Sequence, residues 1–275
     1  MKGTEKTDIF LEKLKADSTE YKELETKGYS PEEKKNAIRS LMNIRMPRKL
    51  SDELLDLQNQ YLQEEQKAKG VVTLADIPTI KEQFDSKASC AGKVSLWQGD
   101  ITRLEVGAIV NAANSQMLGC FVPCHRCIDN AIHSAAGMQL REECSHIMNH
   151  RRMKYGRSYE EPTGTATLTN AYNLPCKYVI HTVGPIVYGR LNDKLCQDLQ
   201  NCYENVLQCC LEHHIKSVAF CCISTGEFHF PNEKAAEIAW KTVTAFLEKH
   251  GEYMERVIFN VFKDSDRNIY ERRLG

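Results

Sequence analysis

From residue 93 onward, short apolar runs alternate with longer segments of helical character, and this alternation limits the possible folds more than any other feature. Each run has the length of a strand, and several are apolar throughout, as is typical of strands buried on both faces. Strands that alternate with helices predict an α/β fold with a mostly parallel sheet between helix layers. The runs are residues 94–97, 108–110, 178–180, 218–223 and 257–262, and the expected helices are 128–144, 193–213, 232–250 and 266–274.

The first part of the chain differs from the rest in composition. It is rich in charged residues and leucine, its apolar residues recur at near-helical spacing, and all 12 cysteines come later, from Cys90 onward. Ser30 and Ser51 stand where helices are expected to begin, because serine side chains cap helix N-termini. We therefore expect an N-terminal helical extension at residues 1–84 and an α/β domain at residues 85–275.

Charge and hydropathy exclude several classes of protein. The formal net charge of -1 gives no overall attraction to nucleic acid. No apolar run approaches the roughly 20 residues needed to cross a bilayer. The chain begins with a charged segment rather than an apolar signal sequence, so we expect a cytoplasmic protein whose cysteines are free or bound to metal. Nucleic acid and membranes are not expected partners.

Cys120, His125 and Cys127 lie close together on one loop of the expected fold. Thiolate and imidazole ligands together favour zinc over magnesium or calcium. Three protein ligands leave one coordination position free, as in catalytic rather than structural zinc sites. Cys124 is the expected spare thiol, because the side chains of adjacent residues usually diverge. Two alternatives stay open: a structural site with Cys124 as fourth ligand, and a group of cysteines without metal.

The loop that carries these residues is expected at the carboxyl edge of the sheet. Residues 111–129 follow one apolar run and residues 224–230 follow another. In open α/β sheets, ligands bind where loops leave the carboxyl ends of the strands. The sequence therefore predicts a single site built from both loops.

Six short segments also occur in the order seen in one known family. They are QGDIT (98–102), AIVNAAN (108–114), DNAIHSAAG (129–137), PTGTA (162–166), YVIHTVGP (178–185) and ISTG (223–226). These segments resemble the macrodomain family, which binds ADP-ribose, over roughly residues 93–274. Ordinary members have a glycine-rich loop where this chain has residues 121–127. That departure resembles the zinc-containing subclass, which also has a helical N-terminal extension.

The resemblance implies a three-layer α/β/α macrodomain with a mixed, mostly parallel sheet. Members of the zinc-containing subclass are microbial hydrolases that remove ADP-ribose from proteins, which implies one Zn²⁺ per chain and an ADP-ribosylated protein as substrate. They often occur with a sirtuin-like ADP-ribosyltransferase and a lipoyl-carrier protein, so these are expected partners. A non-catalytic ADP-ribose reader with a structural zinc is the alternative, and a phosphatase acting on ADP-ribose is a third hypothesis.

The resemblance also assigns residues to the nucleoside. Asp100 would accept a hydrogen bond from the adenine amine, and Ile101 would add a backbone contact. Asn111 and Asn114 carry amides that suit ribose hydroxyls, because an amide both donates and accepts hydrogen bonds. Phe262, at the end of the last apolar run, is a candidate for stacking on adenine.

The second loop resembles the family's phosphate-facing loop. Gly226 permits a positive φ and a close backbone approach, so that successive N–H groups can face a diphosphate. Phe228 stands where the family places an aromatic residue beside the distal ribose. The expected members of this loop are Ser224, Thr225, Gly226, Glu227 and Phe228.

Asp129 begins the helix expected after the zinc loop, where the helix N-terminus favours an ionised carboxylate. It would act as a general base on water or on the 2-hydroxyl of the distal ribose, with Asn114 as a second catalytic residue. Ile128 would lie beside them in the substrate site. Zinc would bind ribose hydroxyls or the water nearby. Simple helix capping is the competing interpretation of Asp129.

Overall fold

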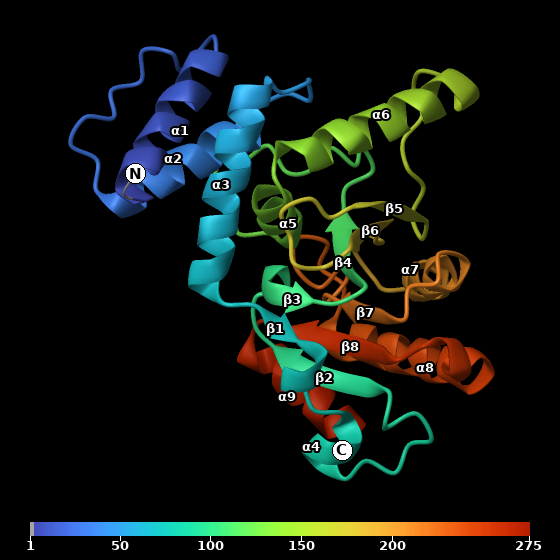
Figure 1. The fold of residues 1–275 in the computed structure, drawn as a ribbon. Helices are drawn as coiled ribbons and strands as arrows, with labels where there is room; N and C mark the ends of the chain where they lie inside the picture. Colours follow the sequence, from blue (N-terminus) through green and yellow to red (C-terminus); the bar gives the residue numbers. More distant parts are fainter. Residues whose placement is uncertain (1–2) are drawn as a thin grey trace.

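The computed structural model describes residues 3–275, with side-chain environments from residue 6 onward. Its centre is a six-stranded sheet of order β2-β8-β7-β4-β6-β5, in which the β5–β6 pair is antiparallel and the other pairs are parallel (Figure 1). The predicted mixed, mostly parallel sheet is therefore confirmed. The strands are β2 (Val94–Gln98), β4 (Ala108–Ala113), β5 (Ala166–Asn170), β6 (Tyr178–Val183), β7 (Ser217–Phe220) and β8 (Arg256–Val261).

The apolar runs in the sequence predicted every strand of this sheet except β5. That strand lies at the edge and alternates buried threonines, Thr167 and Thr169, with more exposed residues, so it contains no continuous apolar run. The strand expected at 218–223 ends earlier than predicted, at Phe220, and the chain turns away from the sheet there. A separate parallel pair joins β1 (Val72–Thr73) to β3 (Leu104–Glu105).

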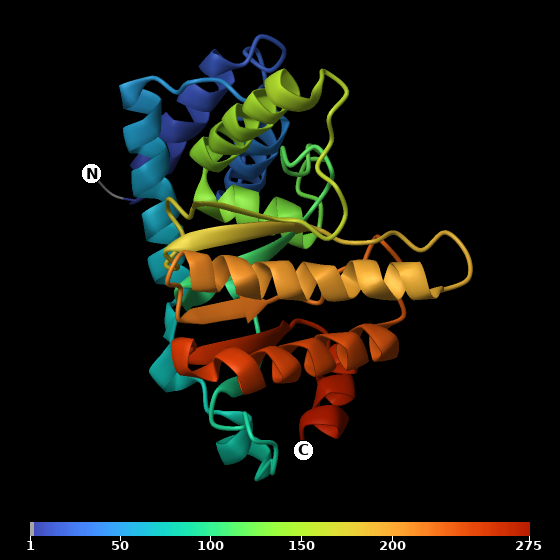
Figure 2. The same cartoon turned by 90° about the vertical axis from the view of Figure 1, so that its right-hand side faces the viewer.

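Helices cover both faces of the sheet, which confirms the three-layer α/β/α fold. Helices α7 (Asp193–Glu212) and α8 (Asn232–His250) lie side by side across one face (Figure 2). Helices α5 (Ile128–Ala136) and α6 (Met138–Tyr155) lie on the other side, where α5 packs on β4. Helix α9 (Asp264–Leu274) packs against α8, β2 and β8.

The prediction of a single helix at residues 128–144 is wrong. Gly137 has φ 100°, a conformation that L residues with side chains rarely adopt, and it ends α5 and starts α6 in a new direction. After this break α6 extends to Tyr155, well beyond the predicted end at residue 144.

Three helices form the N-terminal region beside α5 and α6: α1 (Gly3–Asp17), α2 (Pro31–Ile44) and α3 (Asp52–Lys69) (Figure 1). Ser30 caps α2 in a capping box with Glu33, and Ser51 caps α3, so both predicted helix starts are confirmed. These helices share an apolar core, which includes Phe10 and Ile38, and Met138 of α6 joins it. The domain boundary after residue 84 stays a prediction.

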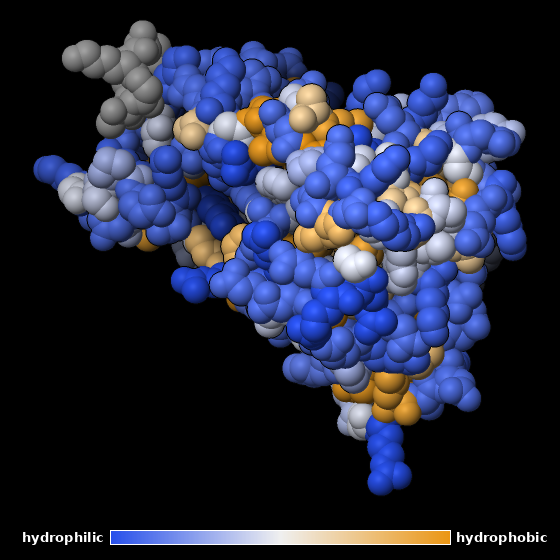
Figure 3. Space-filling view, turned by 90° about the horizontal axis from the view of Figure 1, so that it is seen from below, coloured by the Kyte–Doolittle hydropathy of each residue, from blue (hydrophilic) through white to orange (hydrophobic). Residues whose placement is uncertain are grey.

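Short elements connect the helices to the sheet: η1 (Leu74–Asp76), α4 (Ile80–Phe84), η2 (Ile101–Arg103) and η3 (Gly251–Tyr253). Viewed from the side of α4 and α9, the surface is mostly hydrophilic, with apolar residues in small groups (Figure 3). Within the described chain, no helix combines the length and apolar character that crossing a membrane requires.

Candidate functional site

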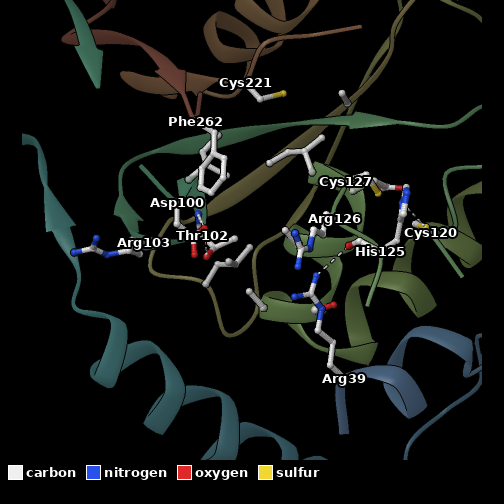
Figure 4. A pocket seen from close by; sticks show the side chains of 18 of the residues that line it. Arg39, Asp100, Thr102, Arg103, Cys120, His125, Arg126, Cys127, Cys221 and Phe262 are labelled. Carbon is white, nitrogen blue, oxygen red and sulfur yellow. Dashed lines mark hydrogen bonds between the residues drawn. The ribbon is translucent and has the colours of Figure 1, made fainter. Parts of the chain in front are cut away.

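A cleft of about 980 Å³ opens at the carboxyl ends of the parallel strands. Residues that follow β2, β4, β7 and β8 line one side, and α2 and α3 of the N-terminal region line the side facing them (Figure 4). This is the edge at which the site was predicted. The predicted residues that line the cleft are Asp100, Ile101, Asn114, Cys120, His125, Cys127, Ile128, Asp129, Ser224, Thr225, Gly226, Glu227, Phe228 and Phe262.

Asp100 and Phe262 lie at one end of this cleft. The Asp100 carboxylate accepts hydrogen bonds from the Thr102 amide at 3.0 Å and hydroxyl at 2.6 Å, and pairs with the Lys69 ammonium at 3.2 Å. Burial opposes ionisation, but these contacts outweigh it and lower the pKa of Asp100. The Phe262 ring is 76% exposed and lies beside Asp100 in Figure 4. An ionised acceptor next to an open aromatic face suits a planar base that carries an amine.

The loop after β7 turns sharply at Ser224. This residue has φ 64°, its carbonyl accepts the Phe230 amide at 2.9 Å, and its hydroxyl is buried without a hydrogen-bond partner in residues 6–275. The expectation that Gly226 supplies a positive φ is wrong, because the reversal occurs at Ser224 and again at His229. Gly226 instead has open space where a Cβ would stand, so its backbone can approach a ligand closely.

Asp129 is buried at the start of α5, with its carboxylate held by two amides. Asn111 donates to Oδ1 at 2.7 Å, and Asn114 donates to Oδ2 at 3.4 Å. Burial raises the pKa of Asp129 to about 6, although the Asn111 hydrogen bond and the charge of Arg141 oppose the rise. The helix N-terminus was expected to favour the ionised carboxylate, and burial opposes that effect at Asp129. A carboxyl group with a pKa of about 6 can both accept and return a proton near neutral pH.

Asn111 does not line the cleft. Its side chain is fully buried and spans from Asp129 to His181, whose Nδ1 lies 3.1 Å from the Asn111 amide nitrogen. His133 Nε2 lies 3.5 Å from the same Asp129 oxygen. Asn111 thus positions the Asp129 carboxylate, and a direct contact between Asn111 and a ribose stays a prediction.

Cys120, His125 and Cys127 come together at the other end of the cleft (Figure 4). The Cys120 sulfur lies 3.6 Å from His125 Nδ1, and one donor atom of each residue lies within 4.8 Å of the others. All three are half-buried, so they remain accessible from the cleft. The donor set fits a zinc ion, because two thiols and an imidazole converge and a fourth side could take a ligand.

Cys124 belongs to the same loop but faces α2. Its φ is 52°, its sulfur contacts the Ser40 hydroxyl at 3.3 Å and the Asn36 carbonyl at 3.4 Å, and its amide donates to Asn43 at 3.0 Å. The left-handed backbone at Cys124 turns this side chain away from the other three. This geometry therefore does not form a metal site with Cys124 as the fourth ligand.

Two arginines that the sequence analysis missed hold the Cys120–Cys127 loop in place. The buried Arg141 donates to carbonyls of the loop, at Leu118 (2.7 Å) and Cys120 (3.3 Å), and to carbonyls at the end of α2. Its guanidinium also lies 4.2 Å from the centre of the Phe121 ring. Arg39 of α2 donates to the His125 carbonyl at 3.3 Å and to Asn130. The N-terminal helices are thus part of the framework of this site.

Comparison with known proteins agrees with this geometry. The macro domain family model matches residues 110–239. A protein-ADP-ribose hydrolase from Treponema medium is 48% identical over 244 residues, which cover 89% of this chain and 88% of the relative. A protein-ADP-ribose hydrolase from Staphylococcus aureus strain MSSA476 is 43% identical over 234 residues, with 85% and 82% covered.

A solved structure has the same fold. The Trypanosoma brucei macrodomain in complex with ADP-ribose superimposes with a TM-score of 0.65 at 28% identity, and the match covers 90% of this chain and 96% of that one. The strand order, the cleft position and these relatives lead to one conclusion. The chain belongs to the macrodomain family.

Proposed function

We propose that this chain is a zinc-dependent hydrolase that removes mono-ADP-ribose from modified protein side chains. Its relatives from Treponema and Staphylococcus are named protein-ADP-ribose hydrolase, which supports hydrolysis of an ADP-ribose linkage as the reaction. The observation that carries the proposal is the placement of Asp129 and the Cys120–His125–Cys127 group side by side in one cleft. This combination joins a proton acceptor to a set of metal ligands.

Different residues of the cleft bind different parts of the substrate. Asp100 accepts from the adenine amine, Phe262 covers the ring, and the backbone at Ser224 and Gly226 faces the diphosphate. The distal ribose lies beside Asn114. The Asn114 amide nitrogen already donates to the Gly119 carbonyl and to Asp129, so its amide oxygen accepts from a ribose hydroxyl. This arrangement leaves the anomeric carbon next to the metal ligands.

The reaction breaks the bond between the anomeric carbon and the protein side chain. Asp129 takes a proton from water or the ribose 2-hydroxyl, and Asn111 keeps its carboxylate in place through a 2.7 Å hydrogen bond. Cys120, His125 and Cys127 would hold the zinc ion, which when bound would supply Lewis-acid polarisation of an oxygen close to that bond. The water oxygen ends on the anomeric carbon, and a proton ends on the released side chain.

We also propose a cellular setting for this reaction. A hydrolase of this type reverses the work of an ADP-ribosyltransferase, and we propose a sirtuin-like transferase as its counterpart and a lipoyl-carrier protein as a substrate. Both would place the enzyme in the cytoplasm. The helical extension at residues 1–84 would form one wall of the cleft and help to select the protein.

The test is release of ADP-ribose from an ADP-ribosylated protein, with products identified by mass spectrometry. Wild-type protein should release intact ADP-ribose, and a chelator followed by added Zn²⁺ should abolish and restore the reaction. Asp129→Asn should slow release by about 10²- to 10⁴-fold, the usual contribution of a general base. Binding of the modified protein without release would instead identify a reader, and release of inorganic phosphate would identify a phosphatase.

A further inference from the structure

Arg126 lies between two proposed metal ligands, His125 and Cys127, but its side chain does not join them. The residue is exposed and lines the cleft. Figure 4 shows its guanidinium extending toward the middle of the cleft, between Asp100 and His125. Within residues 6–275 its side chain has no hydrogen-bond or ion-pair partner.

Of the other cations that line the cleft, three already have partners, and Lys263 follows Phe262 at the Asp100 end. Lys69 pairs with Asp100 at 3.2 Å, and Lys35 pairs with Glu65 at 2.8 Å. Arg103 donates to the Gly70 carbonyl at 2.8 Å. A guanidinium that has no such partner keeps its donors available for a ligand, and five N–H donors in a planar fork match phosphate oxygens well.

A second guanidinium reaches the same part of the cleft from α2. Arg39 bonds to the carbonyl of His125, the residue directly before Arg126, and its other partner is the neutral amide oxygen of Asn130. In the described side chains no carboxylate forms an ion pair with either arginine, so two unpaired guanidinium groups face one region, although acidic residues such as Asp129 and Glu227 also line the cleft. Such a region favours an anion.

We infer that Arg126, assisted by Arg39, binds the diphosphate of ADP-ribose and thereby sets the distance between adenine and the distal ribose. The inference rests on the ligand of the proposed function. The diphosphate of ADP-ribose connects the adenosine to the distal ribose, and Arg126 lies between the Asp100 end and the metal-ligand end of the cleft. The loop that holds the metal thus also holds the phosphates, and α2 contributes a residue to the substrate site.

Calorimetric titration of the full chain with ADP-ribose, ADP and adenosine tests this assignment without turnover. Arg126→Ala should weaken binding of ADP-ribose and ADP by about 10- to 100-fold, the range for a lost charge-assisted hydrogen bond to phosphate. Adenosine affinity should change less than about twofold. Arg126→Lys should be intermediate because it keeps the charge but loses the planar fork. Arg39→Ala should show a smaller loss with the same ligand pattern.

Arg157→Ala is the matched control, since Arg157 is exposed outside the cleft. A second readout is the salt dependence of ADP-ribose affinity, which should be shallower in Arg126→Ala than in wild type. Unchanged ADP-ribose affinity in Arg126→Ala would overturn the inference, as would an equal loss for adenosine. If ADP-ribose affinity is unchanged but release from modified protein slows, Arg126 contacts the protein instead. Wild type that binds but does not hydrolyse would refute the proposed reaction and leave this assignment intact.

Discussion

Two groups of histidine and cysteine lie within the described part of the chain, and they differ in what their donor atoms already contact. The open cluster is Cys120, His125 and Cys127, and the buried cluster is His133, Cys144 and His181. In each cluster one donor atom of every residue lies within 4.8 Å of the others. The distances between donor atoms therefore do not distinguish the two clusters.

The open cluster faces the cleft and has few internal partners. Apart from the 3.6 Å contact between Cys120 and His125, its ligands make weak contacts: Cys127 accepts the Asn130 amide at 3.4 Å, and His125 lies 3.9 Å from Glu227. Burial raises the pKa of the Cys127 thiol to about 12, so a neighbouring cation is needed to hold it as thiolate at neutral pH.

The buried cluster is closed to solvent and joins the hydrogen-bond network behind Asp129. His181 contacts the Thr169 hydroxyl at 3.0 Å and the Asn111 amide at 3.1 Å, so both of its ring nitrogens are in use. Cys144 lies 3.8 Å from His181. We infer that the buried cluster supports Asp129. Access from the cleft, rather than the distances between donor atoms, favours the open cluster as the proposed metal site.

The largest expected effect is a difference in zinc content between a variant of the open cluster and a variant of the buried cluster. Cys127→Ala removes a ligand from the open cluster, so zinc should fall from one ion per chain to near zero, and release of ADP-ribose should slow by about 100-fold or more. Cys144→Ala removes a thiol from the buried cluster. It should keep full zinc and lose only ~1 kcal/mol of stability through a small cavity.

Elemental analysis of both purified variants measures the zinc directly. Loss of zinc from Cys144→Ala, with Cys127→Ala still loaded, would reverse the roles of the two clusters. Chemical denaturation of both variants shows whether either change acts through unfolding alone.

A second effect concerns the scaffold that keeps the open cluster in shape. Arg141→Met keeps much of the side-chain volume but leaves buried carbonyls, including those of Cys120 and Asn43, without their donor. The free energy of unfolding should drop by about 3 kcal/mol, and zinc affinity should drop with it. Arg157→Met, an exposed control, should leave both unchanged. Normal stability and zinc affinity in Arg141→Met would show that the loop holds its shape alone.

Acid should destabilise the protein through the buried cluster. Burial lowers the pKa of His181 to about 3, from 6.5 for an ordinary histidine, and lowers that of His133 as well. Below pH 6.5 the unfolded chain binds protons that the folded chain does not, so the free energy of unfolding falls as the pH drops from 6.5 toward 3. The slope is at most about 1.4 kcal/mol per pH unit for each histidine. Groups packed around His181 are His133, Cys144, Asn111, Thr169 and, through Asn111, Asp129.

Denaturant unfolding of His181→Gln at pH 7.5, 6.0 and 5.0 should give a flatter dependence on pH than wild type, whatever its stability at pH 7.5. His146→Gln removes an exposed histidine and should keep the wild-type slope. Equal slopes for His181→Gln and wild type would mean that His181 does not resist protonation in the folded state.

The features of the site that the sequence predicted are those that depend on residues close together in the chain. The proposed ligands Cys120, His125 and Cys127 lie within eight residues, so the sequence alone indicated their chemistry. The contacts of Arg141 with α2 and of Arg39 with Asn130 join residues more than 90 positions apart, and they exist only once α2 packs on α5. No local spacing encodes such contacts. The same holds for Asp129, whose high pKa depends on burial and not on its helix position.

The smallest expected effect concerns Cys124, the thiol that distinguishes a three-ligand site from a four-ligand site. Its sulfur contacts Ser40 and the Asn36 carbonyl on α2, and a serine hydroxyl can make both contacts. Cys124→Ser should therefore keep one zinc per chain and change the rate of ADP-ribose release by less than about twofold. Because serine is a poor ligand for zinc, loss of the metal in Cys124→Ser would show that the loop rearranges around a fourth thiolate. The zinc content of Cys124→Ser, measured together with that of Cys127→Ala, decides between a three-ligand site with an open position and a four-ligand site without one.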